Sequence, residues 1–224
     1  MNAIAARMDF EQGVRIFDKA FNPTGNPKFN VVDLFRITQS DLRLEQPLTT
    51  TNNLLTFPVL NNIQNQAGGQ FNTEIRLAQQ DTFVPTRIGI FFGLPTSSTD
   101  TSFKLYPYPS PFVFTNAAAM EAFYAGKLQI TINNDKYIKN WMLMRHRKVN
   151  QTQQTAAYGA GSPLDQMDMD EDGFVPMQPY CLLGGAADMD VAMPLPLAPT
   201  AVDANTRIVL IFRGLIAQNS TVVN

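Results

Sequence analysis

The chain has 224 residues and a formal net charge of −2, and only 16% of its residues are charged, against roughly 25% in ordinary soluble domains. Apolar residues make up 45% of the chain, which is enough for a folded core and excludes wholesale disorder. The slight negative charge argues against a dedicated nucleic-acid binder, which is normally basic. The single cysteine, Cys181, excludes an intrachain disulfide and therefore a secreted fold built on disulfides.

Neutral polar residues take the place of the missing charges. The chain contains 18 Asn, 15 Gln and 19 Thr, nearly a quarter of its residues. Such a surface forms hydrogen bonds without strong fields, which suits packing against other copies of the same chain. The first residues lack the pattern of a signal peptide, and no apolar run approaches the roughly 20 residues that span a bilayer. We therefore expect a soluble protein made in a reducing cytosol, with no membrane partner.

Residues 1–28 predict an N-terminal arm or helix. Apolar residues such as Val14 and Phe17 share one helical face, although Gly13 interrupts the pattern, and a cluster of Pro, Gly and Asn ends it. The remaining residues, 29–224, predict one domain.

Period-two alternation then predicts a succession of short strands. The first two are centred on residues 32–34 and 42–44. A third apolar segment, 54–60, contains Pro58 and therefore belongs at a sheet edge or a bulge. The run 83–92 is the next strong strand.

Glycines mark one face of that strand. Ile88, Ile90 and Phe92 face one side, whereas Gly89 and Gly93 face the other. We expect the glycine face to allow another segment to approach the backbone closely.

One short helix and a hairpin are expected in the middle of the chain. Residues 116–124 predict the helix, with Asn116 as its N-cap and Gly126 at its C-terminal end. Strict alternation over 127–133 predicts a strand, and the turn that follows leads into a second strand over 137–144.

The C-terminal third combines a loop with further strands. Residues 149–173 read as a polar loop insertion, and 174–183 and 189–197 read as short strands broken by prolines. Residues 206–217 form a closing strand that bends at Arg213-Gly214. At least eight short strands with one internal helix predict an all-β fold, an antiparallel β-sandwich of the jelly-roll kind.

An acidic stretch inside the polar loop is the one candidate metal site. Asp168, Asp170 and Asp172 alternate before a glycine, as in the first half of an EF-hand loop. Pro179 stands where the bidentate Glu should be, so an EF-hand is excluded. We favour a solvated acidic loop tip, with a calcium loop of another kind as the alternative, and we expect no other cofactor.

A basic stretch follows the expected hairpin. Arg145, Arg147 and Lys148 surround His146. They read as a solvated strand end, or as an interface to an acidic neighbouring subunit, for which the stretch 165–172 is a natural partner. Contact with nucleic acid is expected only incidentally, through these residues.

A proline-rich segment carries an aromatic stripe. The stripe consists of Tyr106, Tyr108, Phe112 and Phe114, interleaved with prolines in a pattern typical of an extended segment on the surface. These rings suit a protein interface, where aromatic residues are enriched, and the alternative is stacking on sugar rings.

No catalytic constellation is recognisable. The sequence contains no nucleophile-elbow, phosphate-loop or zinc-protease motif. Cys181 lies in an apolar stretch and reads as a buried, unreactive thiol. We therefore expect no enzyme, and a glycan hydrolase that uses paired carboxylates is the third-ranked alternative.

Four segments together resemble virion structural proteins of bacteriophages, namely the single jelly-roll capsid proteins and the capsid-decorating or vertex proteins. They are Leu105-Tyr106-Pro107-Tyr108-Pro109, Tyr124-Ala125-Gly126, residues 128–133 and residues 191–196. The resemblance implies a homo-oligomeric virion component that contacts copies of itself and other virion proteins and has no catalytic residues.

The function expected from the sequence is therefore a structural protein of the virion, made in the host cytoplasm. Viral assembly would use contacts between copies in a capsid, or in a decoration, vertex or neck oligomer. The alternative is a carbohydrate-recognising β-sandwich, such as a tail-associated receptor-binding protein.

Overall fold

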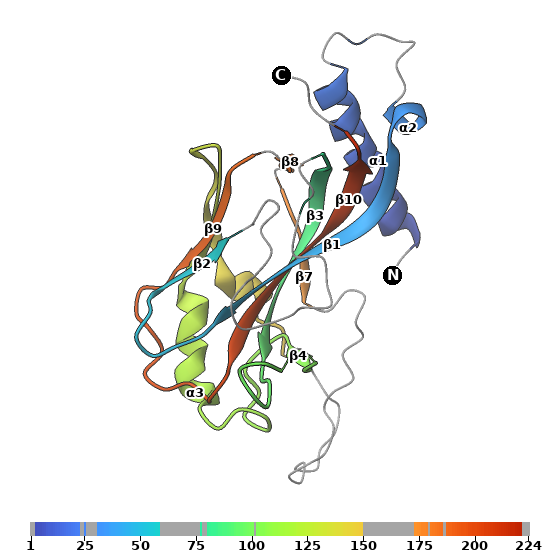
Figure 1. The fold of residues 1–224 in the computed structure, drawn as a ribbon. Coiled ribbons are helices and arrows are strands. Elements are labelled where there is room, and N and C mark those ends of the chain that lie inside the picture. Colours follow the sequence, from blue (N-terminus) through green and yellow to red (C-terminus); the bar gives the residue numbers. More distant parts are fainter. Residues whose placement is uncertain are drawn as a thin grey trace.

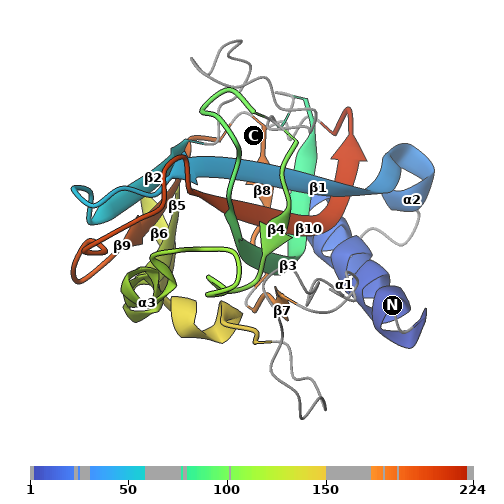
Figure 2. The ribbon, with the colours of Figure 1, turned by 90° about the horizontal axis from the view of Figure 1, so that it is seen from below.

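The fold is a β-sandwich of two antiparallel sheets, seen in two views of the computed structural model (Figures 1 and 2). The structure describes residues 3–22, 25, 31–58, 77, 80–100, 102–149, 173–178, 180–185 and 187–220. The two antiparallel sheets confirm the predicted all-β class.

The long sheet has the strand order β1-β10-β3-β4, and β7 and β8 also pair with β3. Its strands are β1 (Arg36–Pro47), β3 (Thr82–Gly93), β4 (Leu105–Tyr106), β7 (Phe174–Pro176), β8 (Leu183–Gly184) and β10 (Arg207–Gln218). The short sheet has the order β2-β9-β5-β6. Its strands are β2 (Leu54–Pro58), β5 (Lys127–Ile132), β6 (Asp135–Met142) and β9 (Met189–Pro194). Pro58 thus ends an edge strand, as the sequence predicts.

The main core lies between the two sheets. Alternate residues of the long strands point into it, and they meet the inward residues of the short sheet. Its fully buried members include Ile88, Phe92, Ile208, Leu210, Phe212, Phe57, Leu128, Ile130 and Val191. Each such side chain stabilises the fold by about 1.5–3 kcal/mol relative to exposure.

A 19-residue helix, α1 (Ala3–Phe21), packs on the outer face of the long sheet, the face turned away from the short sheet (Figure 1). Its buried Phe17 forms a second small core with Val84 and Leu215. Gly13 lies where a Cβ atom would be 2.4 Å from Leu215 Cδ1. This glycine weakens the helix by about 1 kcal/mol but lets it approach the sheet closely.

The strand predicted around residues 32–34 is wrong. Residues Val31–Leu34 form a single helical turn, α2. Val32 and Leu34 are 49% and 58% exposed. These two side chains therefore do not point into a core. Alternation of apolar and polar residues predicts a strand only where one face of it is buried.

The predicted central helix is confirmed, as α3 (Ala117–Met120) and the 3₁₀ helix η1 (Glu121–Ala125), and Asn116 and Gly126 stand at its ends as predicted. The Asn116 side chain, however, makes no capping hydrogen bond. Its side-chain amide donates to Asp203 Oδ1 (3.1 Å) and its backbone N–H to Asp203 Oδ2 (3.2 Å). Gly126 is extended, and its hydrogen leaves room for Leu195, whose Cδ2 would lie 2.5 Å from a Cβ atom.

The predicted hairpin is confirmed as β5 and β6. Asn133 and Asn134 have φ of 48° and 70°, as a two-residue type I′ turn requires. Asn133 also exchanges two hydrogen bonds with Asp188 (2.8 and 3.0 Å), which tie the turn to the start of β9. The second strand ends at Met142, and the next residues form the 3₁₀ helix η2 (Leu143–His146).

A bulge bends the long sheet where the sequence predicts a bend. The register between β10 and β3 shifts at Arg213/Gly214, so that Thr86 of β3 has no opposite residue. The Thr86 carbonyl accepts from Met177 N–H (2.8 Å), and its hydroxyl donates to the Arg213 carbonyl (3.2 Å). The carbonyl and the hydroxyl of Thr86 thus both have hydrogen-bond partners at the bulge.

Several predictions fall on residues outside the described ranges. They are the polar loop from 150 to 172, with its expected calcium residues Asp168, Asp170 and Asp172, and most of the segment from 59 to 76. In the part of the chain that the structure describes, no helix is both long and apolar enough to cross a membrane.

We expect Gly214→Ala to lower the free energy of unfolding by about 2–3 kcal/mol, because a Cβ atom there would lie 2.0 Å from the carbonyl oxygen of Val84. Gly184→Ala is the matched control, since nothing lies within 4 Å of a Cβ atom at that position. It should change the stability by less than about 1 kcal/mol. Urea unfolding measures both, and equal effects would contradict the close approach of β10 to β3.

Candidate functional site

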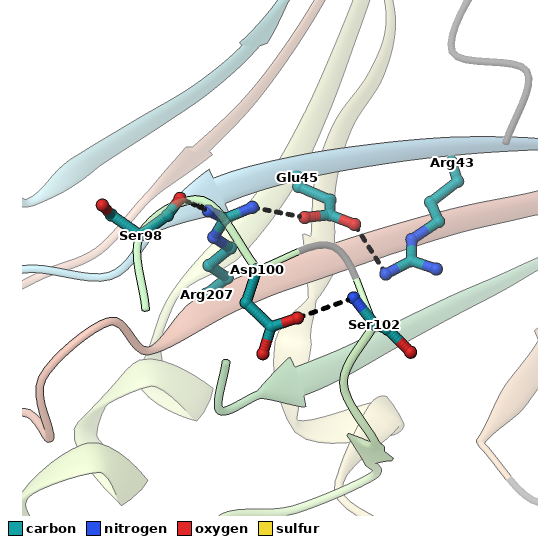
Figure 3. A network of polar contacts seen from close by, with 6 residues as sticks. All are labelled: Arg43, Glu45, Ser98, Asp100, Ser102 and Arg207. Atoms are coloured by element: carbon teal, nitrogen blue, oxygen red, sulfur yellow. Dashed lines mark hydrogen bonds and ion pairs between the residues drawn. The ribbon is translucent and has the colours of Figure 1, made fainter. Parts of the chain in front are cut away.

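Charged residues gather on the outer face of the long sheet, at the end where β1 finishes and β10 begins (Figure 3). Glu45 lies between two arginines. Its Oε1 is 2.6 Å from Arg43 Nη2, and its Oε2 accepts from Arg207 Nη1 at 3.1 Å. The Glu45 side chain is 2% exposed. A carboxylate so deeply buried has to be paired, and the two guanidinium groups provide that pairing.

An aromatic ring completes this charged cluster. Phe103 packs over Gly93, where a Cβ atom would lie 2.2 Å from its ring. The guanidinium carbons of Arg43 and Arg207 lie 5.4 and 5.8 Å from the ring centroid. Both distances are within the range of cation–π attraction. The expectation that Gly93 permits a close approach is therefore confirmed.

The cluster also holds the loop that joins β3 to β4. Arg207 donates to the carbonyl of Ser98. Within the loop, Asp100 accepts from the N–H groups of Ser102 (2.9 Å) and Thr96 (3.0 Å). These backbone hydrogen bonds lower the pKa of Asp100. The polar cluster is thus a clamp that fixes a loop on the sheet. The charges of its two arginines are balanced by the carboxylates of Glu45 and Asp100.

Sequence reasoning missed this clamp. Arg43 and Glu45 stand at outward positions of one strand, where charge is ordinary. Their partner Arg207 is more than 160 residues away in the sequence. Opposite charges two positions apart on one face of a strand, as at Arg43 and Glu45, do indicate an ion pair. The third residue of the cluster, Arg207, depends on the topology of the sheet.

The predicted basic residues do not act as one cationic patch. The guanidinium of Arg145 stacks over the ring of Trp141, 4.9 Å from its centroid. Arg147 donates two hydrogen bonds to Glu121 (2.7 and 3.0 Å), which raise the pKa of Arg147. Lys148 is exposed. Arg147 thus has an acid partner within its own chain, and the acidic partner proposed from the sequence lies outside the described residues.

The two groups with potential reactivity are buried. Burial raises the pKa of Cys181 to about 12 and lowers that of His146 to about 4. The lone pair of His146 Nε2 is occupied, because it accepts from Trp141 Nε1 at 2.8 Å. Cys181 is therefore unreactive, as predicted, and His146 lacks the exposed lone pair of a general base.

The predicted aromatic stripe lies partly against the core. Tyr106 is half-buried and sets its ring edge-on to Phe114, with the centroids 5.6 Å apart. Tyr108 is half-buried on the same core. Phe112 is 55% exposed. Tyr124 fixes the segment by donating to the Pro107 carbonyl (3.0 Å). Of the four stripe residues Phe112 is the most exposed, whereas Phe114 is fully buried in the core, which corrects its predicted place on the surface.

Edge strands provide the other candidate contact surfaces. Among the described strands, β1 pairs with β10 alone, so one side of this 12-residue strand forms an edge of the long sheet. β2 and β6 form the edges of the short sheet. β6 carries Lys136 and Lys139, both exposed, whereas β1 carries the neutral run Thr38-Gln39-Ser40 in its first half, between Arg36 and Asp41. Exposed edges pair with other chains unless charges prevent it.

Within the described ranges, no three His, Cys, Asp or Glu residues group as a metal site. The calcium loop expected at Asp168, Asp170 and Asp172 lies beyond those ranges and stays a prediction.

We expect Glu45→Gln to lower the free energy of unfolding by about 3 kcal/mol, because it leaves two guanidinium groups without their carboxylate. Asp41→Asn is the control. Asp41 is 53% exposed, and its Oδ1 lies 3.4 Å from Arg213 Nε. Loss of that exposed ion pair should change the stability by less than about 1 kcal/mol. Chemical unfolding compares the two, and a Glu45→Gln loss as small as the control would contradict the clamp.

We compared the chain with protein-family models, curated proteins and solved structures, and none of the three comparisons gave a match. The function is therefore inferred from the residues and their geometry.

Proposed function

We propose that the chain is a structural protein of a virion that self-assembles into a capsid or a capsid-associated oligomer. The observation that carries this proposal is the order of the strands. β1 pairs with β10 in one sheet and β2 pairs with β9 in the other, so the chain folds back on itself as a nested pair of ribbons.

We read this nesting as a jelly roll. β3 continues the first sheet beside β10, and β5 continues the second beside β9. Two facing sheets with such alternating connections are the arrangement of jelly rolls, which serve in viral capsids and in lectins. A fold alone does not fix a function, so the surface has to decide between these uses.

The surface favours assembly over sugar binding. A sugar site of the kind predicted needs exposed tyrosine faces, but Tyr106 and Tyr108 are half-buried on the core. The β1 edge, in contrast, is long and carries a neutral polar run, Thr38-Gln39-Ser40, in its first half. Strand addition at such an edge supplies backbone hydrogen bonds with little need for apolar contact. A chain poor in charge and rich in amides suits that mode of association.

We expect the wild-type chain to form a discrete oligomer or particle, measured as solution mass by light scattering and as particles by electron microscopy. Gln39→Lys should weaken assembly at least tenfold in the concentration required, because a lysine on a sheet edge opposes pairing with another strand. Asn140→Lys is the matched control on β6, an edge that already carries two lysines, and it should leave assembly unchanged.

A wild-type chain that stays monomeric at all concentrations would overturn self-assembly. A monomer that binds glycans would instead support the carbohydrate-recognising alternative. Equal loss of assembly in the two lysine variants would place the contact elsewhere than at β1.

A further inference from the structure

The only histidine and the only tryptophan of the chain are bonded to each other in the interior. Trp141 lies near the end of β6, and His146 is the last residue of η2. Trp141 Nε1–H donates to His146 Nε2 at 2.8 Å, and His146 is 0% exposed. Indole nitrogen is only ever a donor, so the accepting nitrogen of the imidazole has to be unprotonated. This contact therefore exists only while His146 is neutral.

The second ring nitrogen points to the neighbouring β7. With Nε2 accepting, the proton of the neutral ring is on Nδ1. Nδ1 is buried without a well-formed hydrogen bond. The backbone of Gly173, which directly precedes β7, nevertheless raises the pKa of His146. Gly173 therefore contacts the imidazole, in a geometry looser than that of a hydrogen bond. His146 thus bridges β6 and the start of β7.

Among the residues that the structure describes, no acid is positioned to stabilise a charged imidazole here. The elements packed against η2 are η1, β3 and β7. Their charged and titratable groups, with those of η2 and its immediate neighbours, are Glu121, Tyr124, Arg87, Arg145, Arg147 and Lys148. Glu121, the one carboxylate among them, is bound by Arg147. Arg145 lies over Trp141 and lowers the pKa of His146 further.

We infer that Trp141 and His146 form an acid-sensitive latch, which holds η2 against the end of β6 while the imidazole is neutral and releases it when the imidazole is protonated. Protonation places a second N–H where the indole N–H already points, so two donors face each other across 2.8 Å. The ring is fully enclosed, so η2 has to move before the charge can be hydrated.

The direction of the pH dependence follows from linkage. Burial gives the latched state a His146 pKa of about 4, below the ordinary 6.5 that an opened, hydrated imidazole has. The opened state therefore binds the proton more tightly, and acid favours opening. The latch is unaffected above about pH 7. Its opening equilibrium rises as the pH falls from 6.5 to 4, by up to about 300-fold, and changes no further below that range.

The single tryptophan makes the latch directly observable. Trp141 emission and far-UV circular dichroism of the full chain would be recorded together from pH 8 to pH 3.5. We expect the emission to change between pH 6.5 and 4 at acidities where the dichroism is still that of the folded chain. His146→Gln is the test variant, because its amide oxygen accepts from the indole but does not titrate. Its emission should stay flat over that interval.

The same emission change in His146→Gln would overturn the latch, and so would wild-type emission that changes only together with the dichroism. Should His146→Gln fail to fold, proton NMR of the wild-type chain decides, since one histidine gives one imidazole signal. A titration midpoint well below 6.5 in the folded chain supports the latch, and a midpoint at or above 6.5 contradicts it.

Discussion

The pairing of β10 with both β1 and β3 is the constraint on which the rest of the structure depends. β10 is the central strand of the long sheet, and over its 12 residues it places one set of side chains in the sandwich core and the other on the outer face. Ile208, Leu210 and Phe212 fill the core, while Arg207 and Leu215 emerge on the opposite side. A slip by one residue would exchange the two faces along the whole strand. The bulge at Thr86 allows the sheet to bend while the two faces keep their character on both sides of the bend.

Two features on the outer face of this sheet depend on the register of β10. At one end Leu215 packs against α1, and at the other end Arg207 pairs with Glu45 in the clamp. Both features require a partner from a remote part of the chain to meet β10 at a fixed position. The pairing of β1 with β10 joins the first of the described strands to the last, so this part of the sheet forms by contacts between residues far apart in the sequence. Folding of this kind is dominated by non-local contacts and is slow compared with that of helical proteins.

The sequence predicts those parts of the fold that depend on a buried side and on local geometry. Alternation locates Leu42 and Leu44 and the strands after them because one face of each strand is in the core, and Asn133-Asn134 specifies a turn by backbone conformation alone. Alternation fails at Val31–Leu34, where Val32 and Leu34 are exposed. Asn116 has the chemistry of a cap, but its side-chain amide donates to Asp203, 87 residues later. The clamp and the Trp141–His146 bond escape prediction for a related reason, since they depend on which surfaces the topology brings together or encloses. The interface roles predicted for six residues concern partners outside a single chain and stay predictions; these residues are Tyr106, Tyr108, Phe112, Arg145, Arg147 and Lys148.

Three groups of the described chain that could take part in chemistry are used internally. Glu45 is held between two arginines, His146 accepts from an indole, and Cys181 is enclosed in the core. Each of these environments removes the group from solvent, whereas catalysis needs a group that the substrate can reach. The exposed strand positions carry charged residues of both signs in equal number, beside a few amide, hydroxyl and apolar side chains. Such a mixed surface binds by shape and by many weak contacts over an area more than by strength at one point, which is the kind of contact that the proposed assembly needs. The proposed latch at His146 would add a position at which acidity, without any ligand, alters the packing of the chain.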